Sequence, residues 1–153
     1  MKKIILILMS TLLLINCKDD DDNSGSTDSA NEIIYLDESH TLEYARMYYI
    51  DNSLNITTGT GDDNYGVNFS FLGLSLEDLG GIYTLNTDEN TYDPENNFSV
   101  GILYYLNDSM NAASGEITVQ VDPENETIQL DFEIMVDGDL VTGHYEGIYS
   151  VWV

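Results

Sequence analysis

The 153-residue chain has little cysteine and few basic residues. Its single cysteine, Cys17, excludes an internal disulfide. Four Lys and Arg stand against 28 Asp and Glu. Five of these acidic residues precede Asn31, which leaves 23 against Arg46 alone and a net charge of −22 from Asn31 onward. Because such a surface repels phosphate groups, we exclude nucleic acids as partners and anionic lipid headgroups as a docking surface.

A transmembrane-length apolar run is also missing from the N-terminus. The run Ile4–Ile15 has twelve residues and follows Lys2 and Lys3. It is too short to cross a hydrocarbon layer of about 30 Å as a helix. A positively charged start followed by an apolar run of this length indicates a secretory signal peptide, here residues 1–16.

The cysteine follows this run directly, in Leu14-Ile15-Asn16-Cys17. This segment resembles the lipobox of bacterial lipoproteins, although Asn16 replaces the usual Gly, Ala or Ser. The resemblance implies that the Cys17 sulfur receives a diacylglycerol and that the signal peptide is cut just before it. Two or three acyl chains on one residue anchor a protein stably. The alternative is an unmodified cysteine in a transmembrane anchor or an exported linker.

Four aspartates come next, in Lys18-Asp19-Asp20-Asp21-Asp22. The segment resembles the acidic export signal of Bacteroidetes-type surface lipoproteins, which implies an outer-membrane protein facing the cell exterior. The alternative is a solvated spacer, since runs of like charge repel themselves. Either way, residues 17–31 form a Gly/Ser/Asp linker, and residues 32–153 remain for one domain of ordinary size.

Sustained helical periodicity is absent from that domain, and period-two alternation is common. Residues 116–122 and 127–134 alternate apolar and polar side chains around a Pro/Asn turn, and Asp137-Gly138 is a strong type I′ turn signal before 140–149. Further strands are expected at 33–36, 42–50, 54–58, 67–72, 82–86 and 98–106, with one helical turn within 75–80. We therefore expect an all-β fold, an antiparallel β-sandwich of about 8–9 strands, with a closed or partly open β-barrel as the alternative.

Strand and turn residues in about half of the domain carry a second resemblance. The segments Gly80–Thr84, Ser114–Val119 and Asp137–Gly147 resemble a group of uncharacterised lipoproteins of the same bacteria. This resemblance implies the fold and the location, and it implies no activity.

Catalytic motifs are absent too. His40 and His144 are the only histidines, and neither lies in a metal-binding spacing or near a Gly-x-Ser-x-Gly elbow. Pairs of carboxylates are so numerous that no pair is informative. We assign no catalytic residue and no cofactor, and leave open a small surface-tethered hydrolase acting on polysaccharide as the alternative function.

Acidic loops offer oxygen ligands of the kind that Ca²⁺ prefers. The candidate calcium ligands are Asp62, Asp63, Asp88 and Asp93. None of these loops matches the complete EF-hand pattern, and a solvated turn is the alternative for each.

Aromatic residues are plentiful, with eleven Tyr and one Trp. In the doublets Tyr48-Tyr49 and Tyr104-Tyr105, neighbouring side chains on a strand point to opposite faces, so one ring of each must point away from the core. An outward ring can stack on a sugar. The leading interpretation is a non-enzymatic, surface-anchored domain that acts in binding or in envelope structure, with a glycan or an envelope protein as its partner. The alternative for these rings is edge-strand packing or a protein contact.

Two short segments, Asp28-Ser29-Ala30 and Asp108-Ser109-Met110, resemble the acceptor pattern of O-glycosylation in these bacteria. The resemblance implies modification of Ser29 and Ser109, which we expect in a linker and a loop.

Overall fold

The computed structural model describes residues 30–152. The predictions for the signal peptide, Cys17, the acidic segment and Ser29 lie outside these residues. The described part contains eleven strands and one short 3₁₀ helix, η1, which confirms the all-β prediction. The elements are β1 (Glu32–Tyr35), β2 (Glu38–Thr41), β3 (Tyr44–Ile50), β4 (Ser53–Gly59), β5 (Tyr65–Leu72), η1 (Leu76–Asp78), β6 (Gly81–Leu85), β7 (Asn97–Phe98), β8 (Val100–Tyr105), β9 (Asp108–Asp122), β10 (Thr127–Val136) and β11 (Asp139–Trp152).

Seven of these strands close into a barrel. Hydrogen bonding runs from β11 through β3, β4, β5, β8, β9 and β10 and returns to β11. The preferred sandwich is therefore wrong, and the structure fits the barrel alternative. The physical reason is the length of two strands: β9 has 15 residues and β11 has 14, and each pairs with both halves of the barrel.

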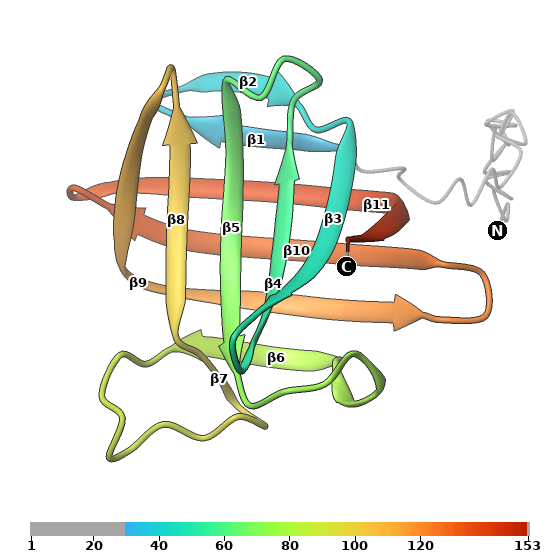
Figure 1. The fold of residues 1–153 in the computed structure, drawn as a ribbon. Helices are drawn as coiled ribbons and strands as arrows, with labels where there is room; N and C mark the ends of the chain where they lie inside the picture. The colour runs from blue at the N-terminus through green and yellow to red at the C-terminus, as the bar shows by residue number, and fades with distance from the viewer. Residues whose placement is uncertain (1–29, 153) are drawn as a thin grey trace, which may run out of the picture.

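The two halves of the barrel cross each other in Figure 1. There β3, β4, β5 and β8 run upright in front of β10 and the long stretches of β9 and β11. The remaining strands extend the rear sheet, because β1 pairs with β11 and carries β2, and β6 pairs with β9 and carries β7. Most pairs are antiparallel, but β11 closes onto β3 in parallel.

Side chains fill the interior of the barrel. The alternating residues predicted to face inward on β10 are all buried, and Ile117 and Val119 of β9 are fully buried as well. Aromatic rings form the centre of this core, with Phe69 contacting Phe98 at 5.5 Å and Phe132 at 5.3 Å between centroids. The predicted turn at Asp137-Gly138 is confirmed, since both residues have positive φ, as type I′ requires.

Two strand segments were not predicted. One is β2, whose Glu38-Ser39-His40-Thr41 has no apolar alternation, and the other is the first half of β9, residues 108–115. Both gain their conformation from neighbours, β1 and β8 respectively, which supply backbone partners to sequences of low strand propensity. Within residues 30–152, no helix has the length and apolar character needed to cross a membrane.

Candidate functional site

The sheet formed by β3, β4, β5 and β8 carries on its outer face a pocket lined mainly by aromatic rings. On β3 the inward residues Ala45 and Met47 are buried in the core, so their alternating neighbours face outward. The pocket, which we call the aromatic pocket, has a volume of about 460 Å³. Its lining residues are Tyr44, Arg46, Tyr48, Tyr49, Thr57, Asp63, Tyr104 and Trp152.

Two glycines are paired with tyrosines that line this pocket. Gly59 of β4 pairs with Tyr44 on one side and with Gly66 of β5 on the other. A Cβ atom on Gly59 would lie 2.7 Å from the Tyr44 hydroxyl oxygen, so the Tyr44 ring lies over the glycine. The neighbouring Tyr104 of β8 is paired with Gly66. The absence of a side chain on Gly59 therefore leaves room for the Tyr44 ring on the outer face of the sheet.

Arg46 places a cation between two of the rings. Its guanidinium carbon lies 3.8 Å from the centroid of the Tyr44 ring and 5.0 Å from that of Trp152. These distances are within the range of cation–π attraction. The parallel pairing of β11 with β3 sets Trp152 beside Tyr48 and thereby brings the indole to Arg46. The Trp152 side chain stays open to a ligand, because the residue is 59 % exposed.

Asp63 joins this cluster from the loop between β4 and β5. Its Oδ1 accepts a hydrogen bond of 2.6 Å from the Tyr44 hydroxyl and lies 3.7 Å from Nη1 of Arg46. Burial, and then the hydrogen bond to the Asp63 carboxylate, raise the pKa of Tyr44 to about 12. Tyr44 is therefore a neutral donor at ordinary pH, and Asp63 remains an acceptor.

A second set of hydrogen bonds fixes Tyr48. The hydroxyls of Tyr48 and Thr57 donate to Oδ1 of Asn68 at 3.1 and 2.8 Å. The Asn68 amide in turn donates to Ser70. Asn68 is only 4 % exposed although it lies on the outer face of the barrel, so this network satisfies a covered polar group. The Tyr48 ring is thus held in a defined orientation at the pocket wall.

The four tyrosines predicted for glycan stacking divide between two places. Tyr48, Tyr49 and Tyr104 line the aromatic pocket, and the hydroxyl of Tyr49 accepts a hydrogen bond from the backbone N–H of Leu76. Tyr105 lies elsewhere. Its ring packs edge-on against Tyr35 and Tyr65, at centroid distances of 5.2 and 5.3 Å.

Sequence reasoning missed Tyr44, Arg46 and Trp152. The spacing of Tyr44, Arg46 and Tyr48 on one strand is a usable signal, since residues two apart share a face. Trp152 had no such signal, because it reaches the pocket only through the pairing of β11 with β3.

The acidic residues proposed as calcium ligands mostly serve their own turns. Asp62 accepts hydrogen bonds from Thr60 and Asn64, and Asp88 accepts them from the backbone and side chain of Asn90. These hydrogen bonds lower the pKa of both carboxyls. Asp93 likewise accepts from Glu95 and from the Asn96 amide, which lie two and three residues on in the chain. Among residues 30–152, no three His, Cys, Asp or Glu side chains are grouped to hold a metal ion.

Neither histidine lies in the aromatic pocket. His144 Nδ1 is 2.6 Å from Oδ1 of Asp131, and the His40 ring stacks on Tyr65 at 3.5 Å between centroids. Both Nε2 atoms are buried and have no hydrogen-bond partner in the described part of the chain. His40 Nε2 lies 3.7 Å from a carboxylate oxygen of Glu38.

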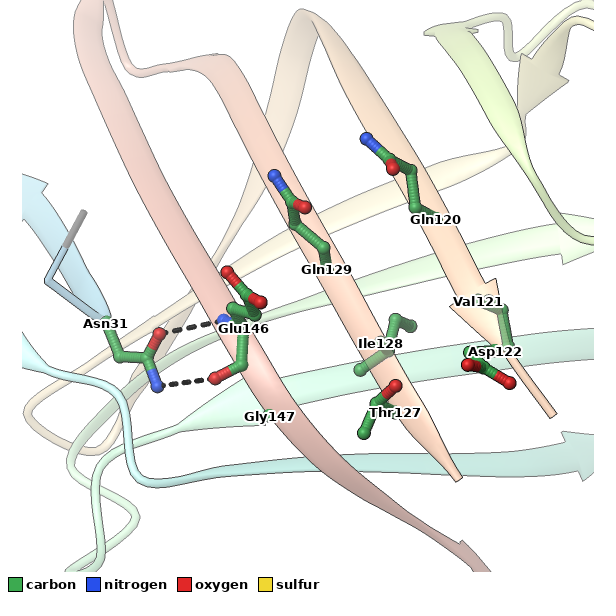
Figure 2. A pocket seen from close by; sticks show the side chains of 9 residues that line it. All are labelled: Asn31, Gln120, Val121, Asp122, Thr127, Ile128, Gln129, Glu146 and Gly147. Carbon is green, nitrogen blue, oxygen red and sulfur yellow. Dashed lines mark hydrogen bonds between the residues drawn. The ribbon is translucent and has the colours of Figure 1, made fainter. Parts of the chain in front are cut away.

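A second, polar hollow lies on the outer face of β9, β10 and β11, with a volume of about 670 Å³. Figure 2 shows the side chains of Gln120 and Gln129 on adjacent strands, with Glu146 beside Asn31. Asn31 binds both backbone groups of Glu146, at 2.9 and 2.7 Å. This hollow is larger than the aromatic pocket, but it has no aromatic ring and no cation in its lining. It offers hydrogen bonds to a ligand without a surface for stacking.

Ser109, a predicted glycosylation site, lies exposed near the start of β9 rather than in a loop. It is paired with Tyr104 of β8.

Comparison with protein families, with curated proteins and with solved structures finds no match to this chain.

Proposed function

We propose that this protein is a non-enzymatic lipoprotein of the cell surface whose barrel binds glycans in the aromatic pocket. The observation that supports this proposal is the grouping of Tyr48, Tyr49 and Tyr104 with Trp152 around one hollow. Sites for organic ligands combine apolar and aromatic walls with a few placed polar groups. A sugar offers a C–H face for the rings and hydroxyls for the polar groups.

The polar groups of the pocket suit a sugar in number and kind. Asp63 supplies a carboxylate acceptor, Thr57 and Tyr104 supply hydroxyls, and Arg46 supplies donors. The exposed Trp152 indole provides a face for stacking. Packing against an aromatic ring adds to the affinity beyond the hydrogen bonds, which a sugar otherwise exchanges with water at little net gain.

The location is proposed from the sequence. A lipidated Cys17 would tether the barrel to the membrane, since two or three acyl chains on one residue anchor a protein stably. The acidic segment Asp19–Asp22 would direct it to the outer face of the outer membrane, where extracellular glycans are met. A Cys17→Ser variant should no longer fractionate with the outer membrane at the mature mass. Retention there would place the anchor elsewhere.

Replacement of Trp152 tests the binding proposal. The Trp152→Ala protein should lose retention on a panel of polysaccharide gels, by about ten-fold in affinity, because truncating a tryptophan at the centre of a binding site typically costs more than about 1 kcal/mol. Ile148→Ala is the matched control, since Ile148 is on the same strand, is 69 % exposed and lies outside the pocket.

The same panel separates this proposal from the hydrolase alternative. Release of reducing ends by the wild-type protein would favour the hydrolase. Retention that is equal for wild type and Trp152→Ala would show that glycans are bound outside the aromatic pocket.

A further inference from the structure

Arg46 is the only lysine or arginine in residues 30–152, and the fold places it in the wall of the aromatic pocket. The rest of the described chain carries acidic groups and so repels anions. A negatively charged ligand group therefore has one place on this domain where it meets a positive charge. That place adjoins the exposed Trp152 ring.

The guanidinium retains donors for a ligand. Within residues 30–152 it makes no hydrogen bond, and its ion pair with Asp63 is 3.7 Å long and involves Nη1. The side chain is 34 % exposed. The rings of Tyr44 and Trp152 hold the guanidinium in position. A planar, positioned guanidinium with free N–H groups matches a carboxylate, which accepts two parallel hydrogen bonds from it.

The neighbouring groups favour a sugar that carries this carboxylate. In a uronic acid the carboxylate is attached to the rim of the pyranose ring, so a ring stacked on Trp152 can direct it to Arg46, whose guanidinium lies 5.0 Å from the indole centroid. Neutral sugars would leave the cation without an anionic partner other than Asp63, which is 64 % exposed and is also bound to Tyr44.

We propose that the aromatic pocket recognises a single uronic acid residue within an otherwise neutral glycan, with Arg46 binding the sugar carboxylate. This inference rests on the proposed glycan-binding function and names its ligand class. The Asp63 carboxylate already lies next to the Arg46 guanidinium. It therefore repels the sugar carboxylate and lowers the affinity for it.

Methyl esters provide the decisive comparison, because they remove the charge and keep the sugar ring. The purified protein is titrated with oligosaccharides that carry one glucuronic or galacturonic acid residue among neutral sugars, and with their methyl esters, at physiological salt. At least one acid form should bind about ten- to a hundred-fold more tightly than its ester, as expected for a charge-assisted pair.

Three variants assign the effect to residues. Arg46→Gln should bring acid and ester to the same affinity, and Arg46→Lys should restore part of the difference, because the charge returns without the planar fork. Asp63→Asn should increase the affinity for the acid form and leave that for the ester unchanged. Equal binding of acid and ester by the wild type would overturn the inference.

The outcomes distinguish this inference from the proposed function. If Trp152→Ala loses binding to neutral and acidic sugars while Arg46→Gln weakens both alike, the pocket binds glycans and Arg46 only supports its rings. If neither variant affects the binding of any sugar, both proposals fail.

Discussion

The hydroxyl of Tyr44 shows how one side chain can organise a charged site. It donates to Asp63, which keeps that carboxylate beside Arg46, and its ring lies 3.8 Å from the guanidinium. The phenol is favoured in its protonated form because its burial, and then the adjacent Asp63 carboxylate, oppose formation of a phenolate. The pKa of Tyr44 in the folded protein is therefore about 12, above the ordinary tyrosine value of 10.0.

A pH titration tests this arrangement. A group with a raised folded pKa contributes stability fully below its unfolded pKa, and that contribution is lost as the pH rises through the folded value. The stability from Tyr44 should therefore be complete below pH 10 and disappear towards pH 12. In titrations followed by phenolate absorbance, the wild-type protein should show one more tyrosine ionisation than Tyr44→Phe, and this ionisation should occur near pH 12. Asp63→Asn should shift that ionisation to lower pH, and an unchanged ionisation would contradict the role of Asp63.

At the scale of the strands, the pair of β10 and β11 depends on a glycine beneath an aromatic ring. Gly143 of β11 is paired with Phe132 of β10. A Cβ atom on Gly143 would overlap the Phe132 ring, which is 3 % exposed and contacts Phe69 in the core. The strand can approach its neighbour here only because the side chain is absent.

We expect Gly143→Ala to destabilise the barrel by about 1–3 kcal/mol, the usual cost of overpacking a core. Urea unfolding followed by tryptophan fluorescence measures the change. Ser150→Ala is the control, because Ser150 is exposed on the same strand and should change the stability by less than about 0.5 kcal/mol. A Gly143→Ala protein as stable as the control would mean that β10 and β11 pack less closely than the structure shows.

For the whole molecule, charge dominates the response to solution conditions. Folding brings the acidic groups, net −22 from Asn31 onward, into a smaller volume. The Debye length falls from about 30 Å at 0.01 M salt to about 8 Å at 0.15 M, so added salt screens repulsion between neighbouring loops. The melting temperature in scanning calorimetry should therefore rise with added NaCl. A constant or falling melting temperature would show that the repulsion is small.

Calcium provides a separate test in the same measurement. Ca²⁺ should add nothing to the melting temperature at matched ionic strength, because Asp62, Asp88 and Asp93 already accept hydrogen bonds within their own turns. An increment beyond the salt effect would indicate a specific site, since a ligand that binds only the native state stabilises it.

The local sequence was enough to predict most of the strands and the strongly acidic charge of the domain. The alternation of apolar and polar residues on β10 and β4 depends only on neighbouring residues, so a period-two pattern predicts these strands directly. The turn at Asp137-Gly138 is likewise a property of two adjacent residues. The charge is a property of composition and needs no structure. The same alternation predicted one outward ring in each tyrosine doublet, which holds for Tyr104-Tyr105, whereas Tyr48 and Tyr49 both line the aromatic pocket.

Only the tertiary structure decided that the sheet closes and that the outward rings converge. Closure depends on β9 and β11 passing from one half of the barrel to the other, and on Trp152 lying beside Tyr48, more than a hundred positions earlier in the chain. No local pattern encodes such pairing, because strand propensity is indifferent to which partner supplies the hydrogen bonds. The register of β3, β4, β5 and β8 determines which side chains share a face of the sheet. This register places Tyr48 and Tyr104 in the same pocket, whereas Tyr105 packs against Tyr35.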